Sequence, residues 1–186
     1  MSDTREKASA KELARVVPHI LEAPKDHAVI TSLCLRPGYG EREFVDEITL
    51  TVAQGMPGER WATAPWLKRE DGSPDPRIQV SILSSRVVDA VWTDPSVMVH
   101  PGDPIVADID TSFANLPAGT RLQAGTAILE VSDAVNDGCV KWKTRYGTDA
   151  KAWLTLPENM PHRLRGVLCR VVQDGVLRRR DRLIKL

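Results

Sequence analysis

The first hydrophobic pattern along the chain is that of an amphipathic helix. The apolar residues that recur at the spacing of one helix face are Leu13, Val16, Val17, Ile20 and Leu21. Ser9 and Glu12 precede them at the spacing of a capping box, in which each side chain accepts a hydrogen bond from the other residue's backbone N–H. Pro18 lies inside the pattern, and because proline lacks a backbone N–H, we expect a kink or a break there. The pattern predicts a helical extension over residues 1–25.

From residue 26 onward, short apolar runs separated by glycine and proline replace the helical pattern. Runs of this kind are typical of sandwiches and barrels. The expected strands are 28–35, 47–53, 104–109, 121–122, 126–132, 167–172 and 176–184. Residues 78–83 and 87–92 fit either a strand or a short helix, and the proline-rich stretch 55–76 fits a loop. The sequence therefore predicts one mainly β domain over residues 26–186.

The last two expected strands are separated by Gln173, Asp174 and Gly175. An Asp-Gly pair between two alternating runs is a strong hairpin signal. We therefore expect these strands to be antiparallel neighbours.

Length and charge narrow the classes of function. A chain of 186 residues can bury the core of one domain without a disulfide or a structural metal. Basic and acidic residues number 25 each, so no net field attracts nucleic acid or an anionic membrane, and we expect neither as a partner. The N-terminal stretch is charged where a signal peptide is apolar, and no run of about 18 apolar residues occurs. We expect a cytoplasmic protein.

The cysteines are few and widely spaced. Cys34, Cys139 and Cys169 form neither a disulfide framework nor a paired zinc motif. Cys34 and Cys169 lie in apolar strand runs, where a free cysteine behaves as a small buried hydrophobe. Cys139 is therefore the candidate for thiol chemistry.

Cys139 opens a basic segment. If this segment is extended, Cys139 shares one face with the basic residues at alternate positions, which are Lys141, Lys143 and Arg145. Neighbouring positive charge stabilises a thiolate, which makes a cysteine a nucleophile or a soft metal ligand. Spacing alone favours the simpler alternative, an amphipathic strand with a solvated basic face and an incidental cysteine.

Short motifs follow one another through most of the chain. Gly55–Trp61 reads GMPGERW and is followed by Gln79 in an apolar run. The later motifs are Gly102-Asp103-Pro104, Asn115-Leu116, the turn and strand over 117–132, Gly138-Cys139, Leu164-Arg165-Gly166 and the segment 171–181. In this order they resemble the MOSC family, the C-terminal domain of molybdenum cofactor sulfurases, over roughly residues 26 to 186. The concordance of many weak elements supports the resemblance.

The chain departs from the family pattern in three places. Glu59 stands where the family has aspartate, no proline precedes Cys139, and Arg180-Asp181 replaces Gly-Asp. None of these changes removes the thiol.

The resemblance implies a β-barrel of the MOSC or pyruvate kinase barrel type with a few peripheral helices and with Cys139 facing a cleft. It also implies chemistry linked to the molybdenum cofactor, molybdopterin. Some members reduce N-hydroxylated compounds with molybdenum held by the cysteine, and others carry sulfur as a persulfide. A thiolate suits both roles. Cys139 is thus the expected catalytic residue and the expected molybdenum ligand.

The resemblance further implies which residues hold the cofactor. Lys141, Lys143, Arg145 and Arg165 would neutralise the pterin phosphate or stabilise a persulfide. The remaining cofactor-binding candidates, from their motif positions, are Arg60, Gln79 and Asn115. Asn115 before Leu116 is equally a routine turn residue. Pyridoxal phosphate belongs to a separate sulfurase domain and is not expected here.

Two classes of function remain open. One is an enzyme or sulfur carrier that acts on a small-molecule substrate, with a redox or sulfurtransferase protein as a possible partner. The other is a non-catalytic barrel module that binds an anionic small molecule or a protein partner. The first class requires an accessible Cys139 of low pKa, whereas the second does not. A serine hydrolase is not supported, since the chain has no G-x-S-x-G motif.

Overall fold

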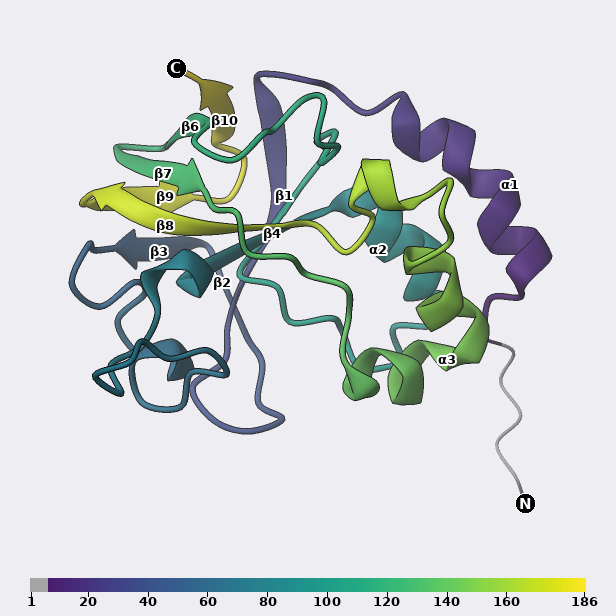
Figure 1. The fold of residues 1–186 in the computed structure, drawn as a ribbon, viewed down its shortest axis with the longest axis horizontal. Helices are drawn as coiled ribbons and strands as arrows, with labels where there is room; N and C mark the ends of the chain where they lie inside the picture. The colour runs from purple at the N-terminus through teal and green to yellow at the C-terminus, as the bar shows by residue number, and fades with distance from the viewer. Residues whose placement is uncertain (1–6) are drawn as a thin grey trace.

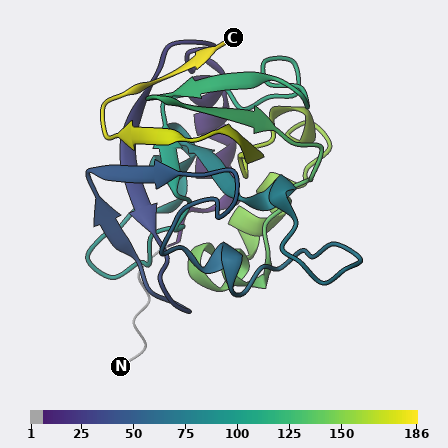
Figure 2. The same cartoon turned by 90° about the vertical axis from the view of Figure 1, so that its left-hand side faces the viewer.

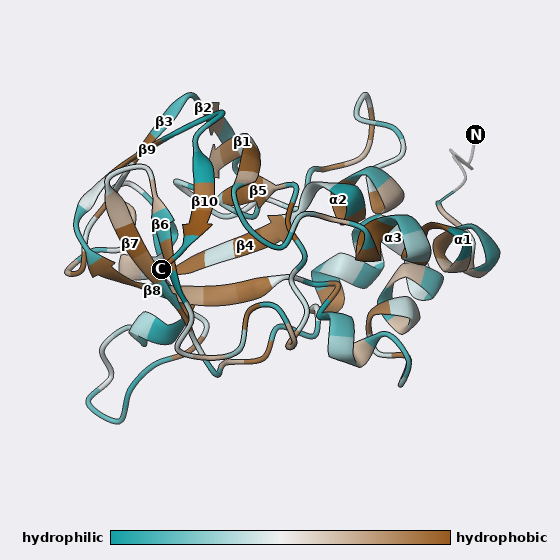
Figure 3. Cartoon of the chain, turned by 90° about the horizontal axis from the view of Figure 1, so that it is seen from above, coloured by the Kyte–Doolittle hydropathy of each residue, from teal (hydrophilic) through white to brown (hydrophobic). Residues whose placement is uncertain are grey.

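The computed structural model describes residues 7–186, so the start of the expected extension, residues 1–6, lies outside the described part. The fold consists of a β-barrel and, beside it, a layer of helices (Figures 1 and 3). The barrel sheet contains β1 Ala28–Leu35, β2 Glu43–Val45, β4 Val80–Ser84, β5 Ile105–Ala107, β6 Arg121–Ala124, β7 Ala127–Val131, β8 Val167–Gln173 and β10 Arg182–Lys185. The helices described are α1 Ala10–Leu21, α2 Ser85–Val91 and α3 Val140–Leu154.

The barrel closes through its first and last strands. Its order is β10-β6-β7-β8-β4-β5-β1, and β1 pairs back with β10 in the register Ala28↔Leu183, while β2 extends the sheet from the other end of β1. Closure leaves no open strand edge along this ring. Seen from the barrel side, the strands enclose the interior and the helices lie behind them (Figure 2). The β-barrel that the sequence predicts is confirmed.

Buried and exposed side chains alternate along the barrel strands, and the buried ones fill the barrel interior. In β6, Leu122 and Ala124 are buried while Arg121 and Gln123 are exposed. This period of two places one face of each strand inside, because successive side chains point to opposite faces. Burying each large aliphatic side chain of this kind contributes about 1.5–3 kcal/mol. Strand β4 is buried along its whole length, since its outer face is covered.

A second core lies between the barrel and the helices. Strands β4 and β5 are parallel, and α2 is the crossover that joins them. The buried side chains of this second core include Leu13, Ile20, Val87, Val91, Trp142, Tyr146 and Trp153. Figure 3 shows the helical layer beside the barrel, with the apolar segments concentrated in the strands. Within residues 7–186, no helix is long and apolar enough to cross a membrane.

The N-terminal helix follows its expected pattern. Ser9 and Glu12 form both hydrogen bonds of the capping box. Helix α1 continues through Pro18 to Leu21, so the pattern is not broken at the proline. A tertiary contact also stabilises the start of α1: the Asp149 carboxylate of α3 accepts a hydrogen bond from the Ala10 N–H at 2.9 Å.

The expected hairpin at residues 173–175 is wrong. Strand β9, Gly175–Arg178, does not pair with β8 but forms a separate two-stranded sheet with β3, Glu47–Leu50. Gly175 lets the chain pass close to the start of β7 on this path, because a Cβ at this position would lie 2.3 Å from the Ala127 nitrogen. The Asp174 carboxylate also accepts a hydrogen bond from the Val52 N–H at 2.8 Å, which holds the turn against the segment that follows β3.

The segments whose secondary structure the sequence left open contain both strand and helix. The ambiguous residues 78–92 contain strand β4 and helix α2, and the stretch 55–76 is mostly loop. The extended conformation considered for the segment after Cys139 is wrong, since this segment is the first half of α3. Gly147, with φ of 99°, lies at a kink between the two halves of that helix.

Gly175→Ala is expected to lower the free energy of unfolding by about 2 kcal/mol or more, since the added methyl meets the backbone of Thr126 and Ala127. Urea unfolding measures the loss. The matched control is Gly38→Ala, whose Cβ would meet only the mobile end of the exposed Glu41 side chain, and it should change stability by less than about 0.5 kcal/mol. Equal losses for both variants would contradict the proposed close approach.

Candidate functional site

Four segments meet beyond one end of the barrel. They are the β1–β2 loop at 36–42, the loop at 56–62, the segment 100–103 before β5, and the start of α3. The β1–β2 loop and the start of α3 both lie at the lower edge of Figure 1. Hydrogen bonds, an ion pair and cation–π contacts connect these segments, although they are far apart in the sequence.

Asp103 is the buried acid at the centre of this region. It is 1% exposed, and its Oδ1 accepts hydrogen bonds from Arg165 Nη1 and Ser81 Oγ, both at 2.8 Å. Burial raises its pKa, but the Arg165 charge and hydrogen bond, the Ser81 hydroxyl and the Arg36 charge together hold the pKa below its usual range. Asp103 is therefore a carboxylate, and its Oδ2 has no hydrogen-bond partner among the described residues.

Two arginines of the β1–β2 loop lie against Gly102. Arg36 donates to the buried Glu59 carboxylate at 2.6 Å. Arg42 donates to the carbonyls of His100 and Gly40 at 2.6 and 2.9 Å. Gly102 has φ of +83°, and a Cβ there would lie 3.0 Å from Arg42 Nε. Only glycine fits both the conformation and the space.

Arg145 approaches the same segment from α3. Its Nη1 donates to the Pro101 carbonyl at 3.2 Å. Burial lowers the pKa of Arg42, and the positive charge of Arg145 lowers it further. Neither guanidinium forms an ion pair with a carboxylate of residues 7–186. Two cations are thus held near one another, and neither is ion-paired with a carboxylate in the described part of the chain.

Lys141 and Arg60 lie over one exposed aromatic ring. The Lys141 ammonium is 4.1 Å from the centroid of the Tyr39 ring, and the Arg60 guanidinium carbon is 5.8 Å from it. Lys141 and Arg145 are four residues apart on α3 and therefore share a helix face. The cationic cluster is hereafter Arg36, Arg42, Lys141, Arg145 and Arg165. Its neighbouring acids are Glu59 and Asp103, so positive charge is in excess.

His100 fixes the shape of the 100–103 segment. It is 4% exposed, and its Nδ1 accepts a hydrogen bond from the Gly102 N–H at 3.0 Å. Its ring lies edge-on to Phe44 and Trp92, at centroid distances of 5.0 and 4.8 Å. Burial lowers the pKa of His100 to about 4; the charge of Asp103 opposes this shift and those of the nearby arginines add to it. The imidazole is neutral at pH 7, as its role as an acceptor requires.

Cys139 is exposed at the N-cap of α3. Its carbonyl accepts the Trp142 N–H at 2.9 Å, which begins the helix. The side chains do not alternate as on a strand, so the single basic face predicted for this segment is wrong. Lys141 and Arg145 point to the cluster, whereas Lys143 is exposed. The thiol is accessible, and it is two residues from Lys141.

Of the other predicted site residues, two lie at the cationic cluster and two have structural roles elsewhere. Arg165 lies in the cluster, with its guanidinium 4.7 Å from the Trp142 ring, and Arg60 lies beside it on Tyr39. Gln79 instead joins strands, because it donates to the Val52 carbonyl and accepts the Val171 N–H. Asn115 donates to the Asp110 carbonyl and accepts from Lys185 Nζ within a buried turn.

Sequence reasoning did not assign a site role to Arg36, Tyr39, Arg42, His100 or the central acid Asp103. A signal was available in the loop that follows β1, which reads RPGYGER and combines two arginines with two glycines around a tyrosine. Such a loop can bring backbone and cations close to a ligand. His100 carries no comparable signal, because its importance comes from burial.

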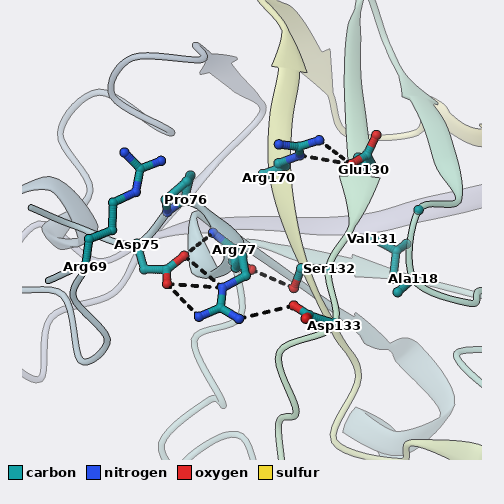
Figure 4. A pocket seen from close by; sticks show the side chains of 11 residues that line it. Arg69, Asp75, Pro76, Arg77, Ala118, Glu130, Val131, Ser132, Asp133 and Arg170 are labelled. Carbon is teal, nitrogen blue, oxygen red and sulfur yellow. Dashed lines mark hydrogen bonds and ion pairs between the residues drawn. The ribbon is translucent and has the colours of Figure 1, made fainter.

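A groove of about 430 Å³ lies elsewhere, beside β7 and β8. Figure 4 shows two of its three arginines in ion pairs, Arg77 with Asp75 and Asp133, and Arg170 with Glu130, while three acids and three arginines line the groove in all. None of the residues predicted for the site lines it. Balanced charge gives this groove no preference for an ionic ligand, so the cationic cluster is the better candidate site. Within residues 7–186, no group of three or more His, Cys, Asp or Glu side chains could hold a metal ion.

The fold matches solved structures. YiiM from Escherichia coli aligns with a TM-score of 0.53 at 15% identity over 84% of this chain and 69% of that chain. The YuaD protein from Bacillus subtilis aligns with a TM-score of 0.52 at 20% identity, covering 84% of this chain and 93% of that chain. YiiM from Geobacillus stearothermophilus aligns with 0.52 at 15%, covering 86% and 75%. No protein-family model and no curated sequence matches. YiiM and YuaD are MOSC-domain proteins, so the resemblance seen in the sequence is confirmed for the fold.

The buried neutral His100 predicts how stability depends on pH. Its pKa is about 4 in the folded state, so below the unfolded pKa of roughly 6.5 only the unfolded chain gains this proton. Stability should fall as the pH drops from 7 to 5, by about 2 kcal/mol from this group. Urea unfolding across that range measures the loss.

The control is His100→Asn, which can keep an acceptor for the Gly102 N–H without titrating. The variant should lose distinctly less stability over the same pH range. Parallel pH profiles for the two proteins would show that His100 is not held neutral.

Proposed function

We propose that this chain, which has the fold of MOSC-domain proteins, binds the phosphate group of the molybdenum cofactor at the cationic cluster and presents Cys139 to the rest of that molecule. The observation that carries the proposal is the pair Arg42 and Arg145, which is held at the His100–Gly102 backbone and forms no ion pair with a carboxylate of residues 7–186. Such charge is unfavourable in an empty site and favourable once an anion is bound.

The donor set fits a phosphate. A guanidinium has five N–H donors in a planar fork that matches phosphate oxygens. Hydrogen bonds to described residues use three donors of Arg42 and one of Arg145. The remaining donors are available to a ligand. Arg36 and Arg165 add positive charge while their own carboxylate partners hold them in place.

Cys139 fits the part of a thiol ligand or sulfur carrier. Its side chain is exposed, so it can react without unfolding any structure. When bound, the cofactor would supply a molybdenum centre for exchanging electrons or oxygen with a small molecule. In the alternative use, the Cys139 thiolate would take a sulfane sulfur from a donor persulfide, whose own thiol would leave in reduced form. The same cations would favour the anionic persulfide.

A binding module without chemistry is the second candidate. The cluster would bind an anion in the same way whether or not Cys139 takes part. Lys143, which the sequence placed beside the thiol, is exposed to solvent and so gives it no enclosed cationic surroundings. The two candidates differ in whether Cys139 takes part in chemistry. Anion binding by the cluster and the role of Cys139 can be tested separately.

Arg145→Ala is expected to weaken binding of inorganic pyrophosphate by roughly 10- to 100-fold, the usual contribution of a hydrogen bond to a charged group. Isothermal titration at low salt measures the affinity. The matched control is Arg170→Ala, which removes an arginine of the charge-balanced groove and should leave pyrophosphate binding unchanged. If both variants bind as the wild type does, the cluster is not the anion site.

Cys139→Ser is expected to abolish bound molybdenum or sulfane sulfur while the melting temperature stays within about 1 °C, because the substituted side chain is exposed. The measurement is elemental and sulfane-sulfur analysis of protein purified from a host that synthesises molybdenum cofactor. Cys34→Ser is a poor control, since Cys34 is buried, so wild-type protein from a cofactor-deficient host serves instead. Absence of both molybdenum and sulfane sulfur from the wild type would favour the binding module.

A further inference from the structure

The loop that joins β1 to β2 crosses the cationic cluster. Its two ends are fixed, because Arg36 is paired with the buried Glu59 and Arg42 donates to three backbone carbonyls. Its tip is Tyr39, which is 77% exposed. Glycines flank this tip, and Gly40 has φ of +82° with open space around it. The tip can therefore change conformation while the ends stay in place.

Cation–π contacts hold the loop tip against the start of α3 and the loop at 56–62. The Lys141 ammonium lies 4.1 Å from the Tyr39 ring centroid, within the range of an attractive cation–π contact. Arg60 adds a second, longer contact at 5.8 Å. No hydrogen bond of the Tyr39 side chain to another described residue accompanies these contacts. The aromatic ring is thus the group that contacts the Lys141 ammonium in this structure.

Lys141 is also positioned to bind an anion. It lies one helical turn before Arg145 on the same face of α3, and Arg145 reaches the centre of the cluster. An anion that extends over one turn can contact both side chains, whereas a small anion on the arginines need not reach Lys141. The ring of Tyr39 and a larger anion would therefore compete for one ammonium group.

We propose that Tyr39 sets the affinity and selectivity of the anion site by competing with the ligand for Lys141. This inference rests on the proposed function, since it assumes that the cationic cluster binds an anion. A site whose binding-competent form is only partly populated shows a proportionally weaker apparent affinity. Tyr39 therefore weakens the binding of anions that need Lys141 and leaves the binding of smaller anions unaffected.

The direct test uses the purified full chain titrated with inorganic pyrophosphate and, separately, with orthophosphate. Tyr39→Ala should strengthen pyrophosphate binding by roughly two- to fivefold, the range expected for loss of an exposed cation–π contact. Orthophosphate binding should change less. Tyr39→Phe keeps the ring and should behave as the wild type.

A double-mutant cycle separates competition from a general effect on the loop. Lys141→Ala should weaken pyrophosphate binding, and adding Tyr39→Ala to it should change nothing further. The matched control is Phe113→Ala, which removes a surface ring lying 4.3 Å from the Arg163 guanidinium and involves no residue of the cluster. It should leave both affinities unchanged.

The possible failures are distinct. Weaker pyrophosphate binding in Tyr39→Ala would make Tyr39 a ligand contact and would overturn the competition. Unchanged binding in Tyr39→Ala, with measurable binding in the wild type, would overturn this inference and leave the anion site intact. Absence of binding in both the wild type and Tyr39→Ala would overturn the anion site itself.

Discussion

The buried carboxylate of Asp103 is the charge on which the geometry of the site depends. A carboxylate that is 1% exposed is costly unless it is paired and hydrogen-bonded, so Arg165 and Ser81 must stay with it. Arg165 in turn lies 4.7 Å from the Trp142 ring of α3. One ion pair thus links the barrel wall, the segment before β8 and the helical layer. Arg42 and Arg145 bind the backbone of the segment 100–103 that carries this acid.

The surrounding cations exceed what the acids neutralise. Glu59 and Asp103 are matched by Arg36 and Arg165, while Arg42 and Arg145 bind only backbone carbonyls of the described chain. Mutual repulsion of the two arginines lowers the stability of the fold, and hydrogen bonds to backbone carbonyls hold both guanidinium groups in place. Functional sites commonly retain local interactions that are unfavourable for folding alone. The charge-balanced groove beside β7 shows the opposite arrangement, in which every pair stabilises the surface.

The segment after Cys139 illustrates where local patterns fail. Its basic residues alternate, which predicts a strand, whereas its buried residues recur at Trp142, Tyr146, Ala150 and Trp153, which is the spacing of a helix. Trp142 and Tyr146 precede the kink at Gly147, and Ala150 and Trp153 follow it, so each half of α3 contributes two buried positions at helical spacing. Burial of aromatic side chains against α1 and α2 outweighs the weak preference of the alternating charges. The thiol therefore lies at a helix start, and two of the three cations assigned to it serve the cluster instead.

Features that depend on neighbouring residues can be predicted from the amino-acid pattern alone. The capping box at Ser9, strand β1 and the burial of Cys34 and Cys169 follow from local hydrogen bonding and from the period of apolar side chains, so they were predicted correctly. The order of the short motifs that resemble the MOSC family also predicts the β-barrel fold. The pairing of β9 with β3 and the proximity of Arg42 to Arg145 arise instead from how the whole chain packs. These contacts join residues about a hundred positions or more apart, and their proximity depends on barrel closure and on the packing of α3, which no local pattern encodes.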